Sequence, residues 1–164
     1  MTSDQSAPDS SSASIGRREP AVEGWFTTDD VAPALLGARC KSCGTYVFPP
    51  MVLFCPNPGC ESESFETVEL SRRGRIWSYT DTRYQPPEPY VATDPFEPFC
   101  IAAVELDKEK IVVLGQVVEG FSVEDLQVGM NVELVLGALN PEPAGGPDPV
   151  ERVIWKWRPL GDSP

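Results

Sequence analysis

Four of the five cysteines in this chain are spaced for metal coordination. Cys40 and Cys43 form a C-x2-C pair, Cys55 and Cys60 form a C-x4-C pair, and both pairs lie in turns that contain glycine or proline. Two close pairs on short turns can bring four sulfur atoms to the corners of a tetrahedron, the arrangement that Zn²⁺ takes from thiolates. The spacing therefore predicts one bound zinc ion.

Other interpretations of the same cysteines are weaker. A redox C-x2-C motif is expected within a βαβ pattern, which is missing here, and two structural disulfides need an oxidising compartment. Iron held by the same four thiolates stays open at this stage. Because a centre with four protein ligands has no position for water or substrate, the predicted metal is structural.

The chain contains no histidine. This excludes Ser-His-Asp triads, Cys-His dyads and zinc centres with histidine ligands, and it removes the usual proton shuttle near neutral pH. The fifth cysteine, Cys100, lies in an apolar segment and is expected to be a buried small hydrophobe. We therefore assign no catalytic residue, and an enzyme acting by itself is not expected.

The beginning of the chain differs in composition from the rest. Residues 1–20 are rich in Ser, Asp and Pro, which predicts a disordered tail, and they lack the apolar segment of a signal peptide. No run of about 18 apolar residues occurs anywhere in the chain. Together these features predict a cytoplasmic protein.

The cysteines must be positioned by short elements. Residues 21–37 are expected to form a helical lead-in, with Thr28 or Asp29 as its cap and Gly37 as its stop. Residues 38–70 are expected to form the zinc ribbon, with two short strands in residues 45–54 that are separated by Pro49 and Pro50. Such a module buries little apolar surface, so its folding is expected to depend on the metal.

The remaining residues, 71–160, have an all-β pattern. Strands are expected at 74–84, 99–106, 111–118, 128–136 and 152–158, with one helical turn at 123–126, a proline-rich loop at 85–98 and a second loop at 140–149. In the first strand Trp77 and Tyr79 are expected to share a face with Arg75 and Arg83. The predicted fold is mainly β: an N-terminal rubredoxin-like zinc ribbon with a short helical lead-in, followed by a five-stranded OB-type barrel.

An ordered set of short motifs runs along the chain. They are Arg39–Gly44, Phe48–Pro50, Cys55-Pro56, Leu70–Gly74, Trp77-Ser78, Ala103–Leu106 and Val128–Met130. This set, spread over about residues 24–159, resembles the bacterial and archaeal family of zinc-ribbon OB-fold proteins associated with acyl-CoA metabolism. Two departures concern the ribbon turn: many members have C-x2-C at the second pair, and a basic residue often stands where this chain has Met51.

The resemblance implies a function that the residues alone do not. Members are typically small partner subunits of thiolase-superfamily enzymes, including thiolases and lipid-transfer-protein-like aldolases. They stabilise the partner and help to form its acyl-CoA channel, in degradation of steroid side chains, aromatic acids or fatty acids, or in archaeal isoprenoid synthesis. A non-catalytic subunit of a hetero-oligomer is therefore expected.

Candidate residues for these roles follow from the chemistry of CoA. Its phosphates favour arginine or lysine, and its pantetheine and acyl parts favour an apolar groove. The candidates for CoA binding are Arg72, Arg73, Arg75, Arg83, Phe48, Trp77 and Tyr79. The candidates for the partner interface are Trp25, Phe26, Tyr84, Tyr90 and Phe96, because aromatic residues are common in interface cores. The alternative is that these aromatic residues are core and the arginines are solvated charges.

A second function class is a single-stranded nucleic-acid-binding module. Zinc ribbons and OB barrels occur in such proteins, and Trp77, Tyr79 and the nearby arginines are the stacking and cationic groups that they use. The formal net charge of −12, from 25 acidic and 13 basic residues, argues against this alternative.

Overall fold

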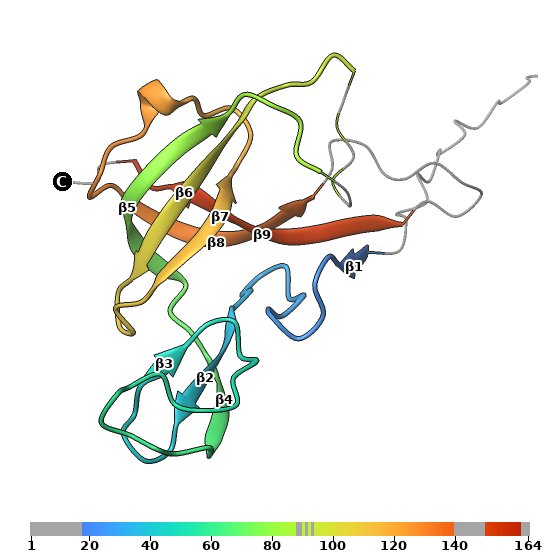
Figure 1. Ribbon diagram of the computed structural model, residues 1–164. Coiled ribbons are helices and arrows are strands. Elements are labelled where there is room, and N and C mark those ends of the chain that lie inside the picture. The colour runs from blue at the N-terminus through green and yellow to red at the C-terminus, as the bar shows by residue number, and fades with distance from the viewer. Residues whose placement is uncertain (1–17, 88–89, 91, 93, 140–149, 162–164) are drawn as a thin grey trace, which may run out of the picture.

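The computed structural model describes residues 18–87, 90, 92, 94–139 and 150–161. Two β modules follow each other along the chain, with the smaller one at one end of a barrel (Figure 1). The predicted mainly β fold is confirmed. The predictions for residues 1–17 and for the loop 140–149 lie outside the described residues.

The smaller module is a three-stranded antiparallel ribbon. It contains β2 (Leu36–Cys40), β3 (Tyr46–Val47) and β4 (Phe65–Glu69), in the order β3-β2-β4. Of the two strands predicted for residues 45–54, only the first forms, because Pro49 and Pro50 end it and offer no N–H for pairing. Residues 51–54 form a loop instead.

The larger module is a closed five-stranded barrel, as predicted. Its strands are β5 (Arg73–Thr82), β6 (Phe99–Leu106), β7 (Val112–Val117), β8 (Asn131–Ala138) and β9 (Glu151–Pro159). Strand β9 pairs with β7 in parallel and with β8 in antiparallel fashion, and β8 returns to β5, which closes the barrel in the OB strand order.

A 3₁₀ turn, η1 (Val123–Asp125), precedes β8 at the predicted place. The Asp125 carboxylate accepts hydrogen bonds from the backbone N–H and the hydroxyl of Ser122, at 2.8 and 2.7 Å. These two bonds satisfy groups at the start of the turn. In the described part of the chain, no helix is long and apolar enough to cross a membrane.

A β-bulge at Trp77 changes the faces of β5. Ile76 lies opposite Val104 and Ser78 lies opposite Ala103, so Trp77 is the extra residue. Ile76 therefore faces the barrel core before the bulge, and Tyr79 packs against that core after it, while Trp77 is 63% exposed. The prediction that Trp77 and Tyr79 share a face is wrong, because strict alternation ends at the bulge.

The predicted helix in residues 21–37 is also wrong. The Asp29 carboxylate accepts from the N–H groups of Val31 and Ala32 and closes a turn, as a cap would, but Pro33 follows and no helix continues. Instead Phe26 and Leu35 pair as an antiparallel bridge across this turn. The lead-in is thus a short loop that returns directly into β2.

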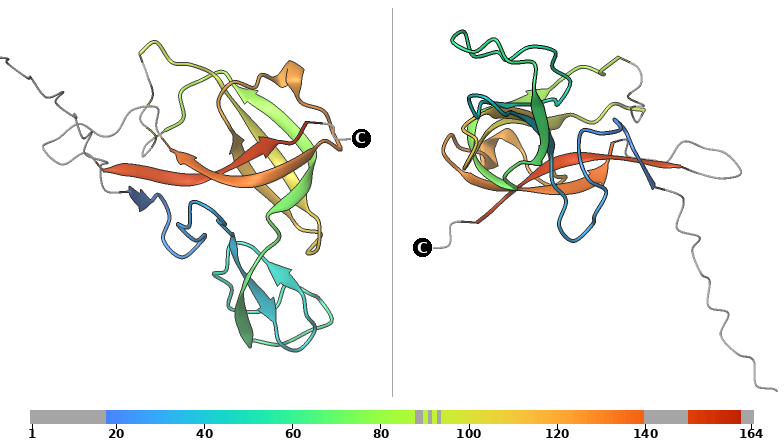
Figure 2. Two further views of the ribbon diagram at one scale, coloured as in Figure 1. Left: turned by 180° about the vertical axis from the view of Figure 1, so that it is seen from behind. Right: turned by 90° about the horizontal axis from the view of Figure 1, so that it is seen from below.

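The predicted disordered tail ends earlier than residue 20. Residues Arg18–Pro20 form β1, which pairs in parallel with β9 and lies beside it in the views of Figure 2. The Arg18 guanidinium forms ion pairs with Asp30 and Glu151. These partners lie far from Arg18 in the sequence, so local composition did not reveal the strand.

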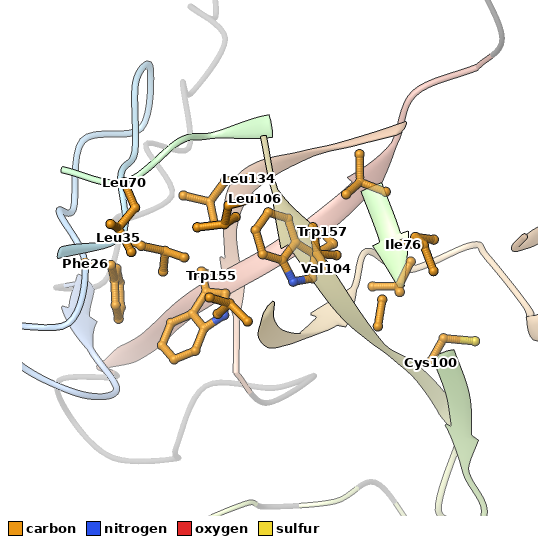
Figure 3. Close-up of a cluster of buried hydrophobic side chains, with 14 of the residues drawn as sticks. Phe26, Leu35, Leu70, Ile76, Cys100, Val104, Leu106, Leu134, Trp155 and Trp157 are labelled. Carbon is orange, nitrogen blue, oxygen red and sulfur yellow. The ribbon is translucent and has the colours of Figure 1, made fainter. Parts of the chain in front are cut away.

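One core runs through both modules. Inside the barrel Ile76, Val104 and Trp157 are buried, and Figure 3 shows that this cluster continues through Trp155 to Phe26. The Trp155 ring centroid lies 5.5–6.2 Å from those of the three lead-in and ribbon aromatics Trp25, Phe26 and Phe48. Trp155 therefore joins the barrel to the ribbon.

Gly115 makes room for this arrangement. A Cβ atom at this position would lie 2.7 Å from Nε1 of Trp157 and 3.0 Å from the Trp155 ring. Only glycine lets both indole rings approach the backbone of β7 so closely. The Trp155 Nε1–H also donates to the Leu114 carbonyl at 2.9 Å, which fixes the ring.

We expect Trp155→Ala to lower the free energy of unfolding by about 3–5 kcal/mol, because it removes a buried ring that both modules share. The matched control is Trp77→Ala, which removes the same side chain from an exposed position and should change stability by less than about 0.5 kcal/mol. Urea unfolding followed by circular dichroism measures both. Equal losses for the two variants would contradict the role given to Trp155.

Candidate metal centre and docking surface

The four predicted cysteines lie together at one end of the ribbon. Their sulfur atoms all lie within 4.8 Å of one another, with 3.8 Å between Cys40 and Cys60 and 3.5 Å between Cys43 and Cys55. A tetrahedral zinc ion with bonds of about 2.3 Å to sulfur requires sulfur–sulfur distances of about 3.8 Å. The cluster therefore fits a four-thiolate metal centre and is too wide for disulfides.

Two short turns present the sulfur atoms. The Gly44 N–H donates to the Cys40 carbonyl at 2.9 Å, and Gly44 has a φ of 77°, a conformation that favours glycine. In the second turn the Cys60 N–H donates to the Asn57 carbonyl at 2.9 Å. Each turn brings its two cysteines to the same side of the ribbon, where all four sulfur atoms meet.

The thiols influence one another strongly. The Thr45 hydroxyl and backbone N–H donate to the Cys43 sulfur and lower the pKa of this thiol to about 6. At Cys60 the Ser62 N–H lowers the pKa, but burial and the other three sulfurs outweigh it and raise the pKa to about 12. Four thiolates this close need a cation to neutralise them, and a divalent metal does so.

Polar contacts also hold the ribbon to the barrel. The Arg39 guanidinium lies 5.8 Å from the Tyr46 ring centroid, and the ammonium of Lys108, in the β6–β7 turn, lies 5.9 Å from it. In the same turn both carboxylate oxygens of the buried Glu109 accept from the Ser71 N–H at 3.2 Å, just before β5. The β6–β7 turn of the barrel therefore contacts both the ribbon, at Tyr46, and the segment that joins the two modules, at Ser71.

The structure separates the arginines that the sequence grouped. Arg73 lies opposite Glu133 and Arg75 lies opposite Glu105 on the neighbouring strands. These two carboxylates form their ion pairs with Arg158 and Lys110. Arg83 lies beyond the other end of β5, roughly 25 Å of extended strand from Arg75, and its Nε is 2.8 Å from Asp81.

Arg72 points toward the lead-in, where its guanidinium donates to the Val31 carbonyl at 3.4 Å. The predicted basic cluster for CoA phosphates is therefore reduced to the exposed Arg72, Arg73 and Arg75 at the beginning of β5.

The aromatic candidates have different environments. Phe48 packs on Trp25 and Trp155 at the junction of the modules, and Phe26 is buried there, so these rings hold the chain's own structure together. Tyr90 and Phe96 pack on Phe99 in the proline-rich loop. Among the predicted site aromatics in the described residues, Trp77 and Tyr84 are the two that are mostly exposed.

A surface that the sequence analysis missed lies on the ribbon. Met51, Leu53 and Phe54 are 82%, 80% and 63% exposed in the loop before Cys55. Three large apolar side chains within four residues form a patch of the kind that marks interaction sites. The available signal was an apolar run directly after two prolines, where no strand could bury it. We call residues 51–54 the ribbon loop.

Comparison with known families covers both modules. The family model described as "ChsH2, rubredoxin-like zinc ribbon domain" matches residues 31–66, and the one described as "ChsH2, C-terminal OB-fold domain" matches residues 67–137. The predicted resemblance to zinc-ribbon OB-fold proteins is therefore confirmed. The two matches are adjacent, in the order seen in the structure.

Individual relatives agree with this result. A "DUF35 domain-containing scaffold protein" of Methanocaldococcus jannaschii is 34% identical over 129 residues, which are 77% of this chain and 82% of the relative. The "Benzoylsuccinyl-CoA thiolase subunit BbsA" of Geobacter metallireducens is 37% identical over 112 residues, 68% of this chain and 67% of the relative.

A solved structure, "Ltp2-ChsH2(DUF35) aldolase", superposes with a TM-score of 0.56 at 30% identity and covers 77% of this chain and 84% of that one. With the strand order, the four-cysteine cluster and these relatives in agreement, the chain belongs to the DUF35 family, with a ChsH2-type rubredoxin-like zinc ribbon and C-terminal OB-fold domain.

Proposed function

We propose that this chain is a non-catalytic subunit that binds a thiolase-superfamily enzyme, either a thiolase or a lipid-transfer-protein-like aldolase, acting on a CoA thioester. The observation that carries the proposal is the likeness across both modules to a thiolase subunit and to an aldolase complex. The histidine-free sequence leaves the chemistry to the partner. We further propose that the complex acts in the cytoplasm, in the degradation of steroids, aromatic acids or fatty acids.

In this function the metal shapes the ribbon. We propose one Zn²⁺ per chain, held by Cys40, Cys43, Cys55 and Cys60, because their sulfur geometry suits tetrahedral thiolate coordination and the matching family domain is a zinc ribbon. All four ligands come from the chain, so the ion supplies folding energy and no open coordination position. The ribbon loop leads directly into Cys55 and is held by this centre.

The ribbon loop is the proposed docking element. Burying Met51, Leu53 and Phe54 against a partner is worth about 1.5–3 kcal/mol for each side chain before the costs of association. The exposed Trp77, on the barrel, is a second candidate contact. The ribbon and the barrel share one hydrophobic core through Trp155, which supports binding of a single partner to both.

The place of CoA in the complex follows from the charges. Arg72, Arg73 and Arg75 supply three cations, but all three are exposed, so water and salt weaken their attraction for phosphate and the chain alone is a weak phosphate site. We infer that the partner completes the CoA site and that these arginines contribute at its edge. Little CoA binding is therefore expected without the partner.

The alternative function, binding of single-stranded nucleic acid, would use the exposed indole ring of Trp77. Trp77 lies beside Arg75 on the barrel, as a stacking platform requires. The neighbouring outward positions are Glu105, Val112 and Leu114, which are acidic or apolar and do not attract phosphates. No specific observation favours this function over partner binding.

The first test is co-expression with a thiolase-like protein from the same genome. The two proteins should elute together on size exclusion, and Leu53→Ser should weaken the complex at least about tenfold, because an apolar contact of about 1.4 kcal/mol or more is lost. The matched control is Val128→Ser, which changes an exposed apolar residue on the barrel, in the turn after η1. It should leave the affinity unchanged.

Separate elution of the two wild-type proteins, with a partner that is fully stable and active alone, would contradict the proposed function. Equal affinities for Leu53→Ser and the wild-type chain would contradict the docking role of the ribbon loop only. The two outcomes are distinguishable.

The metal is tested separately. Wild-type protein should contain one zinc per chain, and Cys43→Ser should lose it and unfold the ribbon, since a structural centre with a missing ligand no longer supplies folding energy. Cys100→Ala changes the cysteine that lies outside the cluster and should retain the zinc. Elemental analysis after gel filtration gives the result. Iron in place of zinc, or full zinc content in Cys43→Ser, would contradict the assignment.

A further inference from the structure

A small hollow lies between the end of the proline-rich loop, the ends of β7 and β8, and the middle of β9. Its volume is about 210 Å³, below the range of about 300–1,000 Å³ that suits drug-sized ligands. Its apolar wall includes Phe99, Phe121 and Leu139. Its polar groups include Glu97, Gln116, Glu119 and Lys156.

The unusual group in this hollow is a buried ammonium. The Lys156 side chain is 4% exposed and forms an ion pair with Glu119. Its stem lies over Gly137, where a Cβ atom would approach the Lys156 Cδ to 2.8 Å, so a larger residue there would displace it. The chain thus makes space for a lysine inside the hollow.

The carboxylate that pairs with this lysine is much less buried than the lysine itself. Glu119 is 80% exposed, in the turn that follows β7. A buried ammonium is costly unless an anion stays beside it, but nothing in that requirement restricts the anion to Glu119. A carboxylate from another molecule satisfies Lys156 equally well when the exposed Glu119 side chain turns toward water.

From this geometry we propose that the hollow binds a small apolar carboxylate, whose carboxylate replaces Glu119 at the Lys156 ammonium and whose apolar body packs on Phe99, Phe121 and Leu139. The volume limits the ligand to acids of about the size of benzoate or hexanoate. Phosphate is disfavoured, because the hollow offers one ammonium and is also lined by the carboxylates of Glu97 and Glu119. The proposal concerns the isolated chain and does not rest on the proposed partner.

The test is calorimetric titration of the full-length, zinc-loaded chain with benzoate and hexanoate. Both should bind the wild-type protein saturably, and Glu119→Gln should tighten binding at least fivefold, because the competing internal carboxylate is gone. Glu124→Gln is the matched control: it removes one negative charge from η1, outside the hollow, and should leave the affinity unchanged. Lys156→Met, checked for folding by its zinc content and circular dichroism, should abolish binding.

Several results would overturn the proposal. They are no saturable binding of either acid, equal or weaker binding by Glu119→Gln, and equal tightening by Glu124→Gln. Binding of benzyl alcohol as tight as that of benzoate would show that the carboxylate is not recognised, and competition by inorganic phosphate would show that the hollow does not select carboxylates. If Lys156→Met does not fold, the comparison of Glu119→Gln with Glu124→Gln decides the proposal alone.

Discussion

The contact of Trp155 with Trp25, Phe26 and Phe48 is the interaction on which the rest of the structure depends. Without it the barrel has a complete hydrogen-bonded sheet of its own, and the ribbon has only a metal centre and three short strands. Trp155 lies on the last strand of the barrel and meets residues from the start of the chain, so the two ends of the sequence hold the modules together. Gly115 is required for the same reason, because it lets the indole rings lie against β7.

Three parts of the molecule have separate structural roles. The four cysteines determine the shape of the ribbon, the aromatic junction determines where the ribbon lies relative to the barrel, and the ribbon loop carries the exposed apolar surface. A docking surface with a fixed position favours binding of a partner. A mobile surface would have to be ordered in each binding event, and that ordering would weaken the affinity. The hollow around Lys156 lies on the barrel, apart from these three parts.

The sequence predicted those features that depend on residue type and spacing. Cys40, Cys43, Cys55 and Cys60 could be paired into one cluster because the ligand chemistry of thiolates leaves few alternatives, and five barrel strands followed from apolar alternation. The sequence-based predictions were wrong where a local conformation overrides the pattern of residue types. The bulge at Trp77 reverses the faces of β5, and the Asp29 turn resembles a helix cap in sequence. The Lys156–Glu119 pair joins distant residues and had no local signal.

If the ribbon and the barrel meet a partner together, the two modules must tumble as one rigid body. Nuclear magnetic resonance relaxation of backbone amides in the full-length, zinc-loaded chain measures this, because it gives a rotational correlation time for each module separately. We expect the same correlation time for amides in β2 to β4 and for those in β5 to β9. A clearly shorter correlation time for the ribbon would show that it moves independently and would contradict the account.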